Sequence, residues 1–130
     1  MSQSTSSNGA GQAVTIFVVD DEPMLLDLAV ALLQPLGYDV RTFSDPRAAL
    51  KEFPAAKPAV IVTDYAMGGM NGLDLIRECR LINPAQKMIL LSGTVDAAIF
   101  SGLPHKPNRF MLKPYPVNEF IETIRSLAGS

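Results

Sequence analysis

The fold of this chain is indicated most clearly by one segment, Val14-Thr15-Ile16-Phe17-Val18-Val19-Asp20-Asp21-Glu22-Pro23. Its first six residues are all β-branched or aromatic, a composition that favours a buried strand. Pro23 suits the first position of a helix, and the apolar residues after it predict a helix that ends near Leu36, before Gly37. A buried strand therefore leads into three acidic residues and then into a helix.

The alternation of strand and helix continues along the chain. Further strands are predicted at 38–43, 59–63, 87–91 and 108–112, and further helices at 46–53, 73–82, 95–101 and 117–127. Five strands that alternate with helices are typical of a parallel sheet covered on both faces, which is an α/β three-layer sandwich.

The composition of each strand predicts its place in the sheet. The strands at 14–19, 59–63 and 87–91 are apolar along their whole length, as central strands of a parallel sheet are. The strand at 38–43 alternates apolar and polar residues, so we expect it at an edge. These positions match a doubly wound sheet of five strands in the order 2-1-3-4-5.

Length and composition indicate one soluble domain. The chain has 130 residues, of which 48% are hydrophobic, and a net charge of −2, which gives no sign of nucleic-acid binding. Residues 1–13 are polar and are expected to form a disordered tail before a domain at 14–128. No apolar run is long enough to span a bilayer and no signal peptide is evident, so we expect a cytoplasmic protein without membrane insertion.

Four predicted strands end at a chemically active residue. Asp20, Asp64, Ser92 and Lys113 each stand at the carboxyl end of a strand or directly after it. In a doubly wound sheet these ends line one crevice, where ligands bind. Residues more than 90 positions apart in the sequence should therefore meet in one site.

The residue types at these positions complement a phosphoryl group bound with a metal ion. Neighbouring carboxylates repel each other, and a hard cation such as Mg²⁺, which prefers oxygen ligands, relieves that repulsion. A lysine and a serine hydroxyl can both bind anionic oxygens. An aspartate carboxylate can act as the nucleophile in phosphoryl transfer. No His or Cys cluster favours zinc instead.

Four short motifs, each at a strand end, resemble the receiver domains of two-component response regulators. They are Val18-Val19-Asp20-Asp21-Glu22, Val62-Thr63-Asp64-Tyr65-Ala66-Met67, Leu90-Leu91-Ser92-Gly93-Thr94 and Met111-Leu112-Lys113-Pro114. The resemblance covers about residues 14–128 and implies a flavodoxin-like fold.

The resemblance implies a role for each residue near the metal. Asp64 is the expected phosphoryl acceptor and a ligand of Mg²⁺. Asp21 is expected to bind the metal directly and Asp20 partly through water. The backbone carbonyl of Ala66 is the remaining expected protein ligand.

The resemblance also implies how the signal enters and leaves. Ser92 is the expected switch hydroxyl, Lys113 the contact to the phosphoryl oxygens, often followed by a cis proline, and Phe110 an aromatic switch residue. The expected phosphodonor is a histidine of a sensor kinase or phosphotransfer protein. The output is expected to be contact with a downstream protein rather than enzymatic turnover.

Three features depart from the family or from an ordinary helix. Gly68 stands where a proline is common, and the segment 95–108 carries two prolines that should shorten or distort its helix. Between Met24 and Leu33 every residue except Asp27 is apolar, so this helix should expose apolar side chains. We interpret that face as a docking surface for the phosphodonor.

Alternative interpretations remain open at this point. Asp20 and Asp21 could be helix caps, and Phe110 could be core packing. The whole chain could be a pseudo-receiver that binds partners without phosphorylation. It could also be a phosphatase with an aspartyl-phosphate intermediate, although such enzymes typically carry Asp-x-Asp after the first strand. A flavodoxin-like cofactor carrier would need a Ser, Thr and Gly loop where this chain has three acids.

Overall fold

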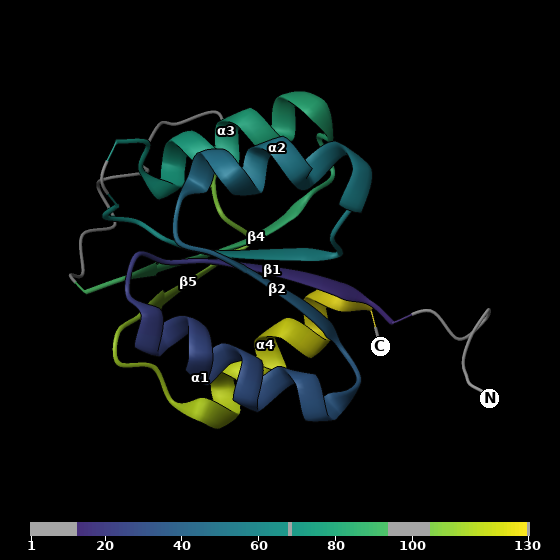
Figure 1. Cartoon of the computed structure of the whole chain (residues 1–130), viewed down its shortest axis with the longest axis vertical. Helices are drawn as coiled ribbons and strands as arrows, with labels where there is room; N and C mark the ends of the chain where they lie inside the picture. Colours follow the sequence, from purple (N-terminus) through teal and green to yellow (C-terminus); the bar gives the residue numbers. More distant parts are fainter. Residues whose placement is uncertain (1–12, 68, 94–104, 130) are drawn as a thin grey trace.

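The structure is a computed structural model that describes residues 13–67, 69–93 and 105–129. Five parallel strands form one sheet in the order β2-β1-β3-β4-β5, as the sequence predicts (Figure 1). The strands are β1 (Thr15–Val19), β2 (Asp39–Phe43), β3 (Val60–Asp64), β4 (Lys87–Ser92) and β5 (Arg109–Leu112). The apolar strands β1, β3 and β4 are central, and the alternating strand β2 lies at an edge.

Within the described residues, four α-helices cover the sheet, two on each face. They are α1 (Pro23–Leu33), α2 (Pro46–Ala56), α3 (Gly72–Ile82) and α4 (Val117–Ala128), and a short 3-10 helix, η2 (Gln34–Leu36), follows α1. Helices α2 and α3 lie on one face, and α1 and α4 lie on the other (Figure 1). The predicted helix at 95–101, the predicted tail and Gly68 lie outside the described residues.

Alternating side chains of the strands build a hydrophobic core on each face. Ile16 and Val18 of β1 point into the cluster under α1 and α4, together with Phe120. Phe17 and Val19 point into the cluster under α2 and α3. The sheet is therefore buried on both faces, which explains why its central strands are apolar throughout.

Two helix ends differ from the sequence prediction for a local reason. The first helix changes to 3-10 geometry at Gln34, because Pro35 has no N–H to continue the α-helical hydrogen bonds, and Gly37 closes it at a φ of 96°. Helix α2 continues through Pro54 to Ala56, beyond the predicted end near Phe53. Lys57 adopts a φ of 49°, and its N–H bonds to the carbonyl of Phe53 to close this helix.

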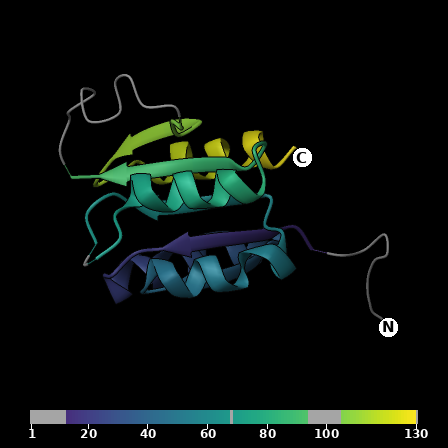
Figure 2. The same cartoon turned by 90° about the horizontal axis from the view of Figure 1, so that it is seen from above.

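The parallel strands place all their carboxyl ends at one edge of the sheet. Figure 2 shows the arrows of β1, β4 and β5 pointing the same way. The edge formed by the carboxyl ends is where the predicted site residues gather.

The helices are short. Within the described parts of the chain, none has the length and apolar character that a membrane span requires.

Candidate functional site

Hydrogen bonds between neighbouring strands bring the predicted site residues to one edge. Asp64, the last residue of β3, is the register partner of Leu91 in β4, and the N–H of Tyr65 donates to the Leu91 carbonyl over 2.8 Å. Ser92 ends β4 and is buried, and the N–H of Lys113 donates to its carbonyl over 2.8 Å. The acceptor candidate, the serine and the lysine thus lie at the ends of three adjacent strands.

Asp20, Asp21 and Asp64 form the carboxylate cluster of this edge. Each offers one oxygen, and these three oxygens lie within 4.8 Å of one another. Asp20 and Asp64 are buried, whereas Asp21 is exposed. Oxygen donors at this spacing, with one side open to water, suit a hard divalent cation such as Mg²⁺, which keeps part of its hydration shell.

Lys113 reaches into this cluster and contacts three carboxylates. Its Nζ lies 3.0 Å from Oδ2 of Asp20, 3.1 Å from Oδ1 of Asp64 and 3.4 Å from Oε1 of Glu22. The side chain of Lys113 is only 16% exposed, and that of Glu22 lies mostly in solvent. Lys113 therefore places a positive charge beside the Asp64 carboxylate, within reach of an anionic group bound there.

Glu22 has contacts that sequence reasoning did not assign. Its N–H donates to Oδ1 of Asp20 over 2.9 Å, in addition to the contact of its carboxylate with Lys113. The available signal was its position as the third acid in a row. The N–H bond leaves Asp20 Oδ2 for the lysine and fixes the orientation of that carboxylate.

The environment shifts the pKa values of Asp64 and Lys113. Burial, reinforced by the charges of Asp20 and Asp21, raises the pKa of Asp64 above its ordinary value, although Lys113 acts in the opposite direction. Burial would lower the pKa of Lys113, but its hydrogen bonds to Asp20 and Asp64 outweigh this and raise it. The lysine is thus held in its charged form beside a carboxylate whose ionisation is costly.

The start of α3 packs directly against the backbone of Asp64. A Cβ atom on Gly72 would lie 2.5 Å from the carbonyl oxygen of Asp64 and 2.7 Å from Cδ1 of Leu90. The N–H of Gly72 donates to the carbonyl of Tyr65 over 2.9 Å, and the hydroxyl of Thr63 donates to the Asp64 carbonyl over 3.0 Å. Gly72 is a positioning residue that the sequence marks only as a glycine at a helix start.

The remaining predicted residues lie around this cluster. Ala66 is exposed in the loop between Asp64 and α3, two residues after the acceptor. Phe110 is half-buried and packs against the core cluster under α2 and α3. The peptide bond between Lys113 and Pro114 is cis, as the resemblance implies. Tyr115, which follows, stacks on Phe120 with ring centroids 4.6 Å apart.

Helix α1 exposes the apolar side chains that its sequence predicts. Met24 is 83% exposed and Leu28 is 38% exposed. Met24 lies two residues after Glu22, whose carboxylate contacts Lys113, so this surface begins close to the carboxylate cluster in the sequence. Its function as a docking surface stays a prediction.

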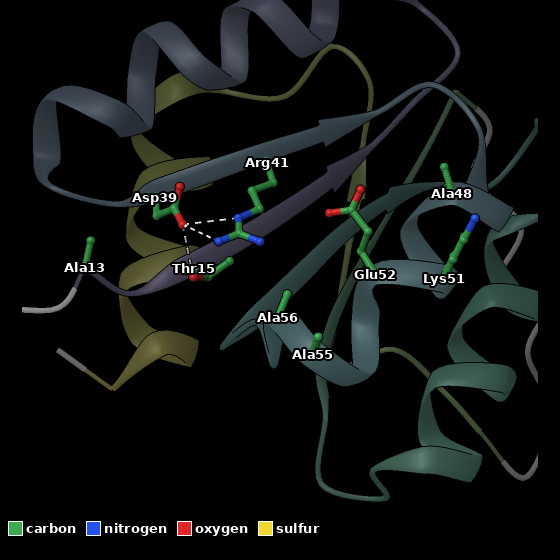
Figure 3. Close-up of a pocket in the computed structure, with 9 residues that line it drawn as sticks. All are labelled: Ala13, Thr15, Asp39, Arg41, Ala48, Lys51, Glu52, Ala55 and Ala56. Atoms are coloured by element: carbon green, nitrogen blue, oxygen red, sulfur yellow. Dashed lines mark hydrogen bonds and ion pairs between the residues drawn. The ribbon is translucent and has the colours of Figure 1, made fainter.

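A broad groove of the molecule lies away from the carboxylate cluster. A groove of about 850 Å³ runs between β2 and α2, beside the first residue of β1 (Figure 3). Arg41 pairs with Asp39 over 3.1 Å, and Lys51 and Glu52 add one charge of each sign. The charges of this groove balance, and the groove lies away from the carboxyl ends of the strands. The carboxylate cluster is therefore the better candidate site.

Comparisons with curated proteins find response regulators. The chain is 32% identical over 119 residues to the probable transcriptional regulatory protein TcrX of Mycobacterium tuberculosis, which covers 90% of this chain and 50% of TcrX. It is 27% identical over 111 residues to the DNA-binding response regulator MtrA of Mycolicibacterium smegmatis, covering 85% of this chain and 49% of MtrA. The chain thus spans about half the length of these relatives.

Solved structures show the same fold. The chemotaxis protein CheY4 of Vibrio cholerae aligns with a TM-score of 0.83 at 22% identity, over 89% of this chain and 99% of that chain. The response regulator TrrA of Thermotoga maritima, solved in complex with Mg²⁺ and BeF, aligns with a TM-score of 0.77 at 30% identity, over 88% and 98%. The sequence model of the response regulator receiver domain matches residues 16–125, and the chain therefore belongs to this family of two-component signalling domains.

Proposed function

We propose that this receiver domain accepts a phosphoryl group on Asp64 from a phosphohistidine of a partner protein, with Mg²⁺ bound beside it. The observation that carries the proposal is the contact of one largely but not fully buried lysine, Lys113, with the carboxylates of Asp20 and Asp64, inside a cluster of three carboxylates. This arrangement supplies a nucleophile, a cation and metal ligands within one small volume.

The bound metal would be held by the carboxylates of Asp20, Asp21 and Asp64 and by the carbonyl of Ala66, and it would neutralise charge on the phosphoryl oxygens. The TrrA structure with Mg²⁺ supports this assignment by similarity. The donor set fits, because all three carboxylates place an oxygen within the span that one ion can bridge.

The transfer itself follows from the positions of the side chains. A carboxylate oxygen of Asp64 attacks phosphorus, a P–O bond forms, the P–N bond to the donor imidazole breaks, and the imidazole nitrogen keeps the electron pair. Lys113 already contacts Asp64 Oδ1 and donates to a phosphoryl oxygen after transfer. The hydroxyl of Ser92, on the adjacent strand end, donates to another.

The phosphorylated state changes the surface by a shift in population. In our proposal Ser92 moves toward the phosphoryl group. The half-buried ring of Phe110, which is the register partner of Leu90 on the neighbouring strand, follows into the vacated space. The altered face of β4 and β5 contacts a downstream protein. The chain acts as a cytoplasmic signalling switch rather than as an enzyme with turnover.

We propose a sensor histidine kinase or a histidine phosphotransfer protein as the donor. The exposed apolar side chains of Met24 and Leu28, on the helix that follows the acidic residues, offer this donor protein a docking surface. The complete acidic set disfavours a pseudo-receiver that is never phosphorylated. The adjacent pair Asp20 and Asp21 disfavours a phosphatase of the Asp-x-Asp type.

Incubation with a small phosphodonor and Mg²⁺, read by intact mass, tests the proposal. We expect one added phosphoryl group in the wild-type protein and none in Asp64→Asn. Asp27→Asn, which alters an exposed acid of α1 outside the cluster, serves as the matched control and should be labelled like the wild type. Equal labelling of Asp64→Asn and the wild type would exclude Asp64 as the acceptor.

A further inference from the structure

A second hollow lies at the edge of the sheet opposite to the phosphoacceptor. It has a volume of about 620 Å³ and is formed by the last turn of α3, the loop that follows it, and the residues at the amino ends of β4 and β5. Lys87 is the first residue of β4, and Asn108 directly precedes β5. The pocket is therefore separated from Asp64 and Lys113 by the length of the strands.

The charges around this pocket all have one sign. Among the described residues that line it, Arg80, Lys87 and Lys106 are cationic and none is acidic. This contrasts with the groove between β2 and α2, whose lining includes the acids Asp39 and Glu52 as well as the cations Arg41 and Lys51 (Figure 3). The concentration of positive charge is notable in a chain with 13 acidic residues against 11 lysines and arginines.

Arg80 is fixed in the wall of the pocket by neutral acceptors. Its Nε donates to the carbonyl of Gln86 over 3.2 Å, its Nη2 donates to Oδ1 of Asn108 over 2.8 Å, and its Nη1 donates to the carbonyl of Lys106. None of the ion pairs within residues 13–67, 69–93 and 105–129 includes Arg80, Lys87 or Lys106. The guanidinium is thus oriented without being neutralised.

The wall that carries Arg80 is itself tied to the sheet. Oδ1 of Asn108 also accepts the N–H of Met88 over 2.8 Å, and the N–H of Asn108 donates to the Met88 carbonyl over 2.8 Å. Arg80 therefore links α3 to the amino ends of both strands. Partial burial lowers the pKa of Arg80, because burying a charged guanidinium is unfavourable. An anion bound nearby would offset this unfavourable term. A cation held in this way is preorganised for an anionic ligand.

We propose that this pocket binds a phosphate-bearing small molecule through its phosphate groups. Three cations from three segments of the chain surround a volume in the range of small-molecule sites, and they can contact the several charged oxygens of a di- or triphosphate together. No aromatic side chain is among the described residues that line the pocket, so the phosphates rather than a stacked base provide recognition. Because the positive charge is gathered in one patch of three cations, a compact polyphosphate can contact all of it at once.

Calorimetric titration with pyrophosphate, without divalent cations and at low salt, tests the proposal. The pocket variant is Lys87→Gln/Lys106→Gln, whose two lysines are exposed, so that folding should be retained. The matched control is Lys51→Gln/Lys57→Gln, which removes the same charge outside the pocket. We expect one site in the wild type and in the control, and a loss of affinity of about tenfold or more in the pocket variant.

Four results would overturn the proposal. One is the absence of binding to the wild-type protein, and another is equal weakening in the pocket and control variants. The third is loss of binding in Lys113→Gln with full binding in the pocket variant, which would place the anion at the phosphoacceptor site. An acidic peptide that binds more tightly than pyrophosphate, and loses affinity in the pocket variant, would replace the small molecule by a protein segment.

Discussion

At the scale of single residues, the site depends on a balance between one lysine and several carboxylates. Lys113 contacts Asp20 and Asp64 at nearly equal distances, and Glu22 is a more distant and exposed third partner. Its charge offsets only part of the effect of burial and of the neighbouring acids, because the pKa of Asp64 is still raised. The ionised acceptor is therefore costly to the fold until another cation binds.

This cost predicts that Asp64→Asn stabilises the protein at neutral pH. A carboxyl group whose folded-state pKa is raised stabilises the fold below its ordinary value of 3.8, and this contribution is lost as pH rises through the raised pKa. Without divalent cations, thermal unfolding at pH 7 should occur a few degrees higher in Asp64→Asn than in the wild type. The difference should shrink as the pH is lowered toward 4, and a lower midpoint for the variant at pH 7 would contradict the explanation.

Gly72 leaves no room for a side chain beside the Asp64 carbonyl. An alanine there would place Cβ against the Asp64 carbonyl and the Leu90 side chain, both of which are buried, so Gly72→Ala should destabilise the protein by about 1–3 kcal/mol. Urea unfolding would measure the loss. Gly93→Ala is the control, because a Cβ at Gly93 meets nothing within 4 Å. Similar stability of the two variants would show that the contact at Gly72 is easily relaxed.

At the scale of secondary-structure elements, helix α1 combines two surfaces. Leu26, Ala29 and Leu33 pack on the sheet, while Met24 and Leu28 face solvent beside the acidic residues. A helix that only covered a sheet would be expected to carry polar residues on its outer side. The exposed apolar residues are the part of α1 that folding does not explain.

We predict that Met24→Ser/Leu28→Glu slows phosphoryl transfer from the partner kinase or phosphotransfer protein by about tenfold or more, which corresponds to about 1.4 kcal/mol of lost interaction. Phosphorylation by a small donor should be unchanged, because the double variant keeps the carboxylate cluster and Lys113. Leu81→Ser alters a side chain that is 67% exposed at the end of α3 and serves as the control. Rapid-quench transfer assays distinguish the cases, and unchanged partner transfer in the double variant would rule out this docking surface.

The sequence predicts most elements because their hydrophobic periods and end signals agree. Pro23, the Asp45 cap before Pro46, and the prolines and glycines between elements mark boundaries that the structure keeps within about three residues. The predicted end of α2 near Phe53 was too early. The helix is closed by Lys57 in a left-handed conformation, which no sequence pattern indicates. Pro54 lies in the last turn, where a missing N–H costs one hydrogen bond only.

The candidate site was predictable only as far as topology determines it. Strand ends bring Asp20, Asp64, Ser92 and Lys113 to one edge in any sheet of this order. The contact of Glu22 with Lys113 and the close approach of Gly72 to the Asp64 carbonyl depend on side-chain direction and loop geometry. Those details arise from tertiary packing, so no local pattern carries them.

At the scale of the whole molecule, the parallel sheet has two chemically different edges. The carboxyl ends of the strands gather carboxylates around one lysine, and the amino ends of β4 and β5 gather cations around Arg80. Both β4 and β5 run from one edge to the other. An anion at the cationic pocket and a phosphoryl group on Asp64 would therefore act on the same two strands.

Magnesium should stabilise the whole fold through the carboxylate cluster. Above the dissociation constant, each tenfold increase in free Mg²⁺ should add about 1.4 kcal/mol to the free energy of unfolding of the wild-type protein. Asp21→Asn should lose most of this gain, whereas Asp27→Asn, outside the cluster, should keep it. Thermal melts at several Mg²⁺ concentrations provide the measurement, and an equal response of the two variants would argue against Asp21 as a ligand.

The proposed function requires that a carboxylate oxygen of Asp64 carry the phosphoryl group. Treatment of the phosphorylated protein with borohydride reduces an acyl phosphate to an alcohol, and peptide mass mapping then identifies the altered residue. Our account predicts homoserine at position 64 alone, only in protein exposed to both phosphodonor and Mg²⁺. Modification at Asp20 or Asp21, or a phosphoryl group on a serine or histidine with Asp64 intact, would contradict it.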